Sequence, residues 1–150
     1  MNLTVTTPLA VITKAGNVVH VRAEDETGAF GILRGHADFL TALTVSVVSW
    51  RDEDGVEHHV AVRGGMLAVS GGDTISIATR EAVADDDLQW LETEVLARFQ
   101  RRSEEEVTAR TDAQRLYLAA IRQIYRFLRP DFSGPVPRLA RPASQEGLES

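Results

Sequence analysis

Three groups of residues in the chain have side chains or spacing that could do chemistry, and the glycine-rich segment from Gly28 to His36 is one of them. Its glycines follow the order G-x-x-G-x-x-x-G, which lacks the Lys-Ser/Thr pair of a P-loop and the G-x-G-x-x-G order of a dinucleotide site. Glycines also permit positive φ angles and close backbone contacts. We therefore interpret this segment as a tight bend of the chain, and not as a phosphate-binding loop.

The other two groups are a histidine pair and an acidic run. His58 and His59 are adjacent in a segment that predicts a strand, so their side chains face opposite sides and cannot hold one metal ion together. Asp85, Asp86 and Asp87 precede a helical pattern, where the helix dipole favours acidic residues. The sequence has no cysteine, and no serine lies in the G-x-S-x-G setting of an activated nucleophile. We predict no catalytic residue, no metal site, no cofactor and no enzymatic activity of this chain alone.

Composition and charge exclude further classes of protein. The 150 residues include 22 acidic and 16 basic side chains, a formal net charge of −6, and 43% are hydrophobic, as in an ordinary globular chain. No apolar stretch approaches the roughly 20 residues of a membrane-spanning helix, and the first residues lack the pattern of a signal peptide. Residues 1–87 carry 6 basic and 13 acidic groups. This acidic part argues against a nucleic-acid partner, because phosphate binding requires clustered Lys and Arg.

The N-terminal part has the pattern of a β-rich domain. Short alternating or β-branched runs lie at 3–7, 18–21, 45–50, 57–62, 66–69 and 74–78. The pairs Asp54-Gly55 and Gly71-Gly72 lie between neighbouring runs and favour hairpin turns. Short strands joined by Gly-rich turns are typical of a sandwich or barrel. We therefore predict a β-sandwich domain over residues 1–84.

After the last predicted strand the hydrophobic period becomes that of a helix. One apolar repeat runs from Leu88 to Phe99, and a second amphipathic run ends at Leu128. A polar stretch and a Thr-x-x-Gln capping box that starts at Thr111 separate the two runs. The expected fold class is thus mainly β plus α, with the sandwich followed by an antiparallel hairpin of two helices over residues 85–129.

Two further features belong to the C-terminal part. Four arginines fall together on the polar side of the second predicted helix: Arg115, Arg122, Arg126 and Arg129. By its residues alone, this basic face fits the solvated side of an amphipathic helix. Pro130 cannot continue a helix, and the residues after it are rich in Pro, Ser and Gly. We predict a flexible tail over residues 130–150.

Several motifs together resemble one known family. The opening Leu-x-Val-x-Thr-Pro is followed by Gly-x-Phe-Gly-Ile-Leu-x-Gly-His-Ala-x-Phe-Leu-Thr-Ala-Leu, which starts at Gly28, and then by Gly-Gly-Met-Leu-x-Val. With the helical part that comes after them, these motifs resemble the ε subunit of F-type ATP synthases over residues 3–128. The details are more similar to the alternative, second-operon form of this subunit.

The resemblance implies a non-catalytic subunit of the central stalk, which couples ion translocation to rotary synthesis or hydrolysis of ATP. It implies a sandwich held against the γ subunit and the c-ring, on the cytoplasmic face of a bacterial inner membrane and associated with it only through the complex. The candidate contact residues with the c-ring or γ are Phe30, Gly31, Ile32, Leu33, Arg34, Gly35 and His36. When extended, the hairpin would present its basic face to the catalytic α and β subunits and inhibit hydrolysis.

Two residues depart from the pattern of the family. Arg34 stands where family members usually have proline, and Ala29 stands where they often have glutamate. Because proline restricts φ, we expect a more mobile turn at Arg34. The first predicted helix also lacks the Ile-Asp-x-x-Arg-Ala motif through which some family members bind ATP, so ATP sensing is not expected. One alternative for the function is a stand-alone nucleotide-binding module, which the missing motif disfavours. The other is a nucleic-acid adaptor that uses the four arginines, which the acidic sandwich and the lack of exposed aromatic residues among the basic ones disfavour.

Overall fold

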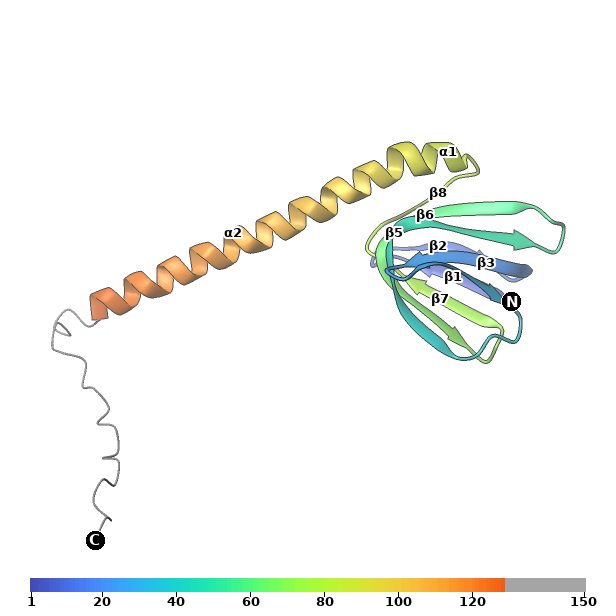
Figure 1. Cartoon of the computed structure of the whole chain (residues 1–150), viewed down its shortest axis with the longest axis horizontal. Helices are drawn as coiled ribbons and strands as arrows, with labels where there is room; N and C mark the ends of the chain where they lie inside the picture. The colour runs from blue at the N-terminus through green and yellow to red at the C-terminus, as the bar shows by residue number, and fades with distance from the viewer. Residues whose placement is uncertain (129–150) are drawn as a thin grey trace, which may run out of the picture. The chain divides into compact units, whose positions relative to one another are not determined.

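The computed structural model of the chain describes residues 1–128, in which eight strands precede a long helical run (Figure 1). The strands are β1 (Asn2–Thr6), β2 (Val11–Ala15), β3 (Val18–Asp25), β4 (Gly28–Leu33), β5 (Phe39–Asp52), β6 (Glu57–Ser70), β7 (Thr74–Ala78) and β8 (Ala82–Ala84). The helical run consists of α1 (Leu88–Trp90), the π-helical turn η1 (Leu91–Val95) and α2 (Leu96–Leu128). The predicted tail over 130–150 and Arg129 lie outside the described residues.

The predicted β-sandwich is confirmed, and its layers come from one sheet that folds over itself. The strand order is β2-β1-β7-β6-β5-β3-β4, and β8 pairs with β6 beside this path. The long strands β5 and β6 keep one register from the pair Phe39–Val69 to the pair Arg51–Glu57. Figure 1 shows both strands curving, so each contributes to both layers.

Two glycines in β6 mark the bend. Gly64 and Gly65 have positive φ angles of 68° and 116°. One edge of β6 pairs with β5. The other edge pairs with β8 before Gly64 and with β7 after Gly65. A Cβ atom on Gly65 would lie 2.1 Å from the carbonyl oxygen of Ala78. The change of partner strand at this point therefore requires a glycine.

The core lies between the two layers and is formed by alternate residues of the strands. Leu3 and Val5 of β1 are completely buried, and so are Ile32 of β4, Leu67 of β6 and Ile75 of β7. Alternation with period two places such residues on one face of a strand. Because burial of each aliphatic side chain contributes about 1.5–3 kcal/mol, this cluster is a large source of stability for the sandwich.

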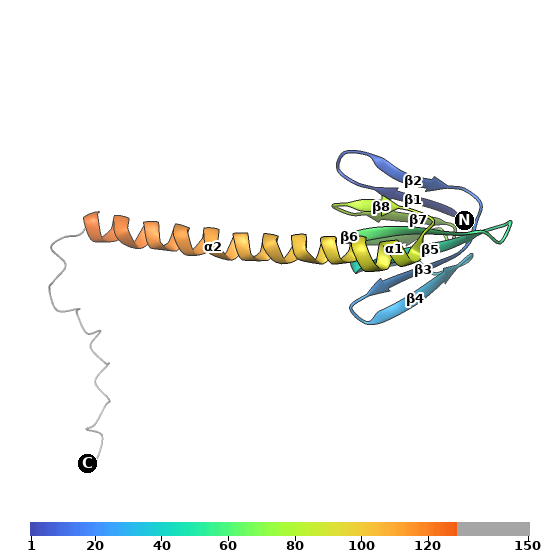
Figure 2. The same cartoon turned by 90° about the horizontal axis from the view of Figure 1, so that it is seen from above.

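The start of the helical run covers the outer face of β5 and β6 (Figure 2). Leu91, Val95 and Phe99 pack there against Ala61, so β6 is buried on both faces at this point. The three residues are four positions apart, which exceeds the 3.6 residues of an α-helical turn. The wider turn of η1 helps to keep Leu91 and Val95 on the same side.

The structure corrects the predicted hairpin of two helices, because α2 continues without a break through residues 101–111. This stretch contains no glycine and no proline, and its Arg, Glu and Ala residues are good helix formers. Nothing in it ends the helix, so Thr111 lies inside α2 and not at a second N-terminus. The N-cap is Asp87, as the acidic run indicates, and its carboxylate accepts a hydrogen bond from the Trp90 N–H at 3.0 Å.

The chain divides into two compact units, with the boundary inside α2. The first unit, residues 1–108, contains the sandwich and the start of the helical run. The second begins at Ala109 and contains the remainder of α2 to Leu128. The first unit thus extends beyond the predicted domain limit at residue 84.

Candidate functional site

Four of the seven candidate contact residues lie on β4, and the other three, Arg34, Gly35 and His36, begin the turn between β4 and β5. This turn is held against the β6–β7 turn by two hydrogen bonds, one of 2.8 Å from the Gly35 N–H to the Gly72 carbonyl and one of 3.0 Å from the Gly71 N–H to Asp38 Oδ1. A third, of 3.1 Å, joins the His36 N–H to the Leu33 carbonyl. Gly35 has a φ angle of 85°. The first two hydrogen bonds join the turn to the β6–β7 turn through Gly35 and Asp38, and the mobility expected at Arg34 stays a prediction.

The seven candidate contact residues do not form one surface. Ile32 is completely buried in the core, so its side chain is not exposed to a partner. The assignment of the segment as a contact surface stays a prediction. Phe30 is half-buried, and its ring meets Phe39 edge to face at 5.6 Å. Leu33 is 59% exposed, and the neighbouring Arg34 is exposed as well. The available part of the segment is therefore the tip of the turn.

Four strands of the first unit share an exposed face without charged residues, which we call the uncharged face, and Lys14 of the neighbouring strand β2 lies beside Thr4 at its edge. Cross-strand partners lie on the same side of a sheet, and the registers of β1, β5, β6 and β7 place the following residues together. They are Asn2, Thr4, Thr6, Leu40, Ala42, Met66, Ala68, Thr74, Ser76 and Ala78. Leu40 is 66% exposed and Met66 45%. Depletion of charge is the compositional sign of the centre of a protein–protein interface.

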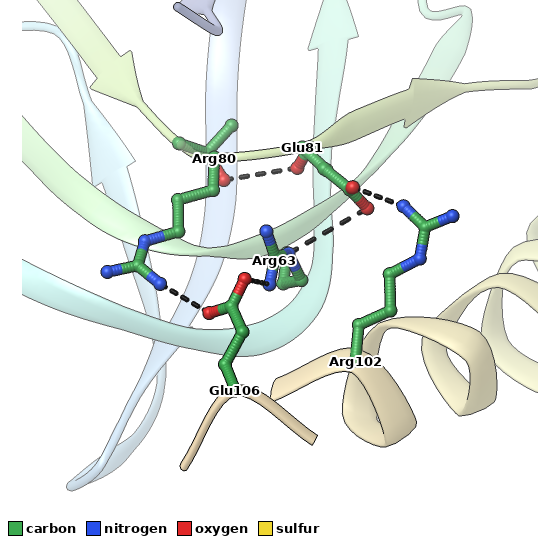
Figure 3. A network of polar contacts seen from close by, with 6 residues as sticks. Arg63, Arg80, Glu81, Arg102 and Glu106 are labelled. Carbon is green, nitrogen blue, oxygen red and sulfur yellow. Dashed lines mark hydrogen bonds and ion pairs between the residues drawn. The ribbon is translucent and has the colours of Figure 1, made fainter. Parts of the chain in front are cut away.

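An ionic cluster joins α2 to the sandwich within the first unit (Figure 3). Its members are Arg63, Arg80, Glu81, Arg102 and Glu106. Arg63 Nη1 donates to Glu106 Oε1 at 2.7 Å, and Arg80 Nη1 donates to Glu106 Oε2 at 2.5 Å. Arg102 pairs with Glu81. Only 8% of the Arg63 side chain is exposed, so this guanidinium lies largely out of water and depends on the two carboxylates.

We expect Glu106 to stabilise the fold at neutral pH but not in acid. The hydrogen bond from Arg63 holds the pKa of Glu106 below its ordinary value of 4.5, so the unfolded chain takes up the proton first as the pH falls. This stabilisation is complete above the ordinary pKa and is lost as the pH falls through the lowered one. Urea denaturation should therefore show a destabilisation by Glu106→Gln at pH 7 that shrinks below pH 4.5.

Glu105→Gln is the control, because Glu105 is an exposed residue of the same helix. Its difference from the native chain should be small at both pH values. A destabilisation by Glu106→Gln that stays the same in acid would contradict the ionised contact between Glu106 and Arg63.

The two histidines have separate surroundings. His58 Nε2 lies 3.0 Å from Asp52 Oδ2, and its ring stacks on Trp50. This hydrogen bond is the main reason why the pKa of Asp52 lies below its ordinary value. His59 is buried, and its Nδ1 lies 2.7 Å from Ser49 Oγ. Residues 1–128 contain no group of three or more His, Asp or Glu side chains arranged to hold a metal ion.

The second unit carries the predicted basic face. Arg115, Arg122 and Arg126 are exposed on α2, and at 100° per residue they lie within a narrow stripe. Large apolar residues outside this stripe are exposed too, among them Leu116, Tyr117, Ile124 and Leu128. None of the helices in the described part of the chain is long and apolar enough to cross a membrane.

The uncharged face and the ionic cluster were not predicted from the sequence. The uncharged face takes alternate positions of four strands, so a separation of the predicted strands at 3–7, 66–69 and 74–78 into their two sides would have revealed part of it. Leu40 and Ala42 lie outside the predicted strands. No comparable signal exists for the ionic cluster, because Arg63 and Glu106 are 43 residues apart.

Comparison with known proteins gives a consistent result. The sequence model of the family described as ATP synthase, Delta/Epsilon chain, beta-sandwich domain matches residues 1–85. ATP synthase epsilon chain 2 of Paraburkholderia xenovorans is 41% identical over 130 residues, which cover 87% of this chain and 94% of the relative. The protein of the same name from Cereibacter sphaeroides is 38% identical over 128 residues, which cover 85% and 88%.

Solved structures agree with these matches. A chain of the Euglena gracilis mitochondrial ATP synthase, in an assembly of OSCP, F1 and c-ring, has a TM-score of 0.53 and 26% identity, and the match covers 57% of this chain and 54% of that one. A chain of the Tetrahymena thermophila mitochondrial ATP synthase central stalk and c-ring has a TM-score of 0.50 over 80% and 95% of the two chains. Its identity of 17% makes it evidence for the fold alone.

Proposed function

The chain belongs to the ATP synthase epsilon subunits and is similar to those named epsilon chain 2, and we propose that it acts as a non-catalytic part of the central stalk. In this role it couples ion translocation to rotary synthesis or hydrolysis of ATP through its contact surfaces. The solved chain at 26% identity belongs to an assembly of F1 with a c-ring. This supports F1 and a c-ring as the partners of the present chain. The nucleotide-binding and nucleic-acid alternatives have no support from the comparisons.

The observation that carries this proposal is the uncharged face. A layer of four strands with Leu40 and Met66 exposed and no charged side chain is suited to a large, permanent protein contact. We assign it to the γ subunit. The tip of the β4–β5 turn, with Leu33 and Arg34, adjoins the β6–β7 turn at one end of this layer and is assigned to the c-ring.

A charge on the uncharged face should weaken binding to γ. We expect Met66→Glu to lower the affinity of the chain for an ATP synthase lacking this subunit by at least about tenfold, because the carboxylate would be buried without a partner. Val19→Glu is a matched control, since Val19 of β3 is as exposed as Met66, at 45%. Equal affinities of the two variants in a titration would exclude this face as the γ contact.

The second unit is proposed to regulate hydrolysis. The exposed stripe of Arg115, Arg122 and Arg126 is suited to acidic segments of the catalytic α and β subunits. Removal of the chain from Ala109 onward should leave assembly intact and increase ATP hydrolysis by the complex. Exchange of Arg122 and Arg126 for glutamate should reproduce most of this increase.

Arg110→Glu provides the control for the charge reversal, because Arg110 is exposed on α2 but lies outside the stripe. Its complex should hydrolyse ATP at the native rate. If the truncated chain and the double reversal both leave hydrolysis unchanged, the second unit has no inhibitory role.

The location follows from the complex. Epsilon subunits belong to a membrane-associated ATP synthase, and we propose that this chain lies at the cytoplasmic face of a bacterial inner membrane, held there by γ and the c-ring. Fractionation of cells should recover it with the membranes, and release of F1 should release it too.

A further inference from the structure

We propose that the ionic cluster keeps the start of α2 fixed to the sandwich while the enzyme works, so that regulatory movement is confined to the helix beyond Thr108. The pivot of the movement would then lie inside α2 and not at its junction with the sandwich. The fixed attachment is independent of the proposed function, whereas its regulatory consequence rests on it.

Two kinds of contact hold the helical run, one after the other. Leu91, Val95 and Phe99 provide the apolar contact with β6. Glu106 lies seven residues beyond Phe99, which is about two helical turns and returns to the same side of the helix. There it accepts hydrogen bonds from Arg63 and Arg80. The ionic cluster thus continues the attachment after the apolar contact ends.

Detachment of this part of α2 would leave Arg63 in an unfavourable state. Its backbone N–H is bonded to the Glu81 carbonyl at 2.9 Å, which holds the main chain of Arg63 within the sandwich. Its Nε has no hydrogen-bond partner and lies 3.7 Å from Glu81 Oε2. The Arg63 side chain is 8% exposed and that of Glu106 is 41% exposed, so loss of Glu106 leaves a largely buried guanidinium and costs more than loss of a fully exposed pair. The contact with Glu106 therefore resists opening.

The part of α2 beyond the cluster has different properties. From Ala109 to Leu128 every side chain except Ile121 is exposed. Thr111 also begins the Thr-x-x-Gln pattern of a helix N-terminus, which lies five residues beyond Glu106. A break of α2 between these two residues would let Thr111 cap a second helix while the ionic cluster stays intact.

Hydrogen exchange on the full chain tests the attachment. Glu106→Gln should accelerate the exchange of the backbone amides between residues 100 and 107 on the order of tenfold relative to the native chain. Glu105→Gln should leave these amides unchanged. The substitution of Glu106 does not alter the sheet, so the variant should remain folded. Equal exchange in the two variants would overturn the proposed attachment.

A covalent tether tests the confinement of the movement. Because the sequence has no cysteine, Glu81→Cys with Arg102→Cys can be joined by a bismaleimide, and the contacts of Glu106 with Arg63 and Arg80 remain in place. The tethered full chain, assembled into ATP synthase, should inhibit hydrolysis as strongly as the same variant without the cross-linker. Loss of inhibition on tethering would overturn the proposed pivot.

A chain that ends at Thr108 distinguishes failure of the regulatory role from failure of the attachment of α2 to the sandwich. If its complex hydrolyses ATP at the same rate as the complex with the full chain, the regulatory part of the proposed function fails. The exchange experiment still decides whether the ionic cluster fixes α2 to the sandwich.

Discussion

A chain that ends at Ala84 is expected to lose most of its stability, whereas a chain that ends at Thr108 should unfold cooperatively at nearly the native urea midpoint. The shorter chain lacks Leu91, Val95 and Phe99, which are all buried against the sheet. At about 1.5–3 kcal/mol for each buried side chain, their loss amounts to roughly 5–9 kcal/mol. A typical domain has a net stability of about 5–15 kcal/mol. The expected loss is thus comparable to the whole stability.

Circular dichroism and urea denaturation of the two truncated chains measure this difference. The chain to Thr108 with Phe99→Ala is an intermediate case, and we expect a loss of about 3–5 kcal/mol from the cavity. A cooperative transition of the chain to Ala84 at the native midpoint would place the folding boundary at the end of the strands, as the sequence predicts. It would also show that the helical run is an appendage.

Substitution of Gly65 by alanine should destabilise the sandwich much more than substitution of Gly28. The two glycines have similar φ angles, 116° and 122°, so the backbone strain imposed on alanine is similar at both. At Gly28 no atom lies within 4 Å of the added Cβ, whereas at Gly65 the Ala78 carbonyl oxygen lies 2.1 Å away. We expect a loss of about 1–2 kcal/mol at Gly28 and roughly 3 kcal/mol or more at Gly65.

The comparison of Gly65→Ala with Gly28→Ala in urea isolates the steric contribution. A lower midpoint for Gly65→Ala alone would show that β7 cannot move away from the bend of β6. Equal losses of stability would mean that the pairing of β6 with β7 adapts to the added atom without cost.

Much of the first unit was predictable because it depends on local patterns. The alternation in runs such as Leu67–Val69 identifies strands, and the Asp54-Gly55 pair identifies a hairpin turn. Asp87 marks the helix start because the N-cap depends on bonds between near neighbours in the sequence. The motif from Gly28 to Leu43 identifies the family.

The candidate site was predicted less completely. The tip residues Leu33 and Arg34 are exposed as a contact surface requires, but Ile32 belongs to the core. The motif identifies the segment as a whole and does not distinguish its two faces. In α2 the capping pattern at Thr111 and the absence of glycine or proline before it favour opposite outcomes. Local propensities differ by less than about 1 kcal/mol per residue, so they do not choose between a hairpin and one helix.

Parts of five strands, two hairpin turns, the helix start and the family follow from the sequence alone, because each depends on neighbours within a few positions or on a contiguous motif. The strands β2, β4 and β8 were not predicted. Only the tertiary structure decided that Arg63 meets Glu106, 43 residues away, and that Ala78 approaches Gly65 closely enough to exclude a side chain. The registers of four strands also decided which residues form the uncharged face. The physical reason is that such contacts depend on how the sheet bends and how its strands align, and residues distant in sequence carry no periodic signal of their meeting.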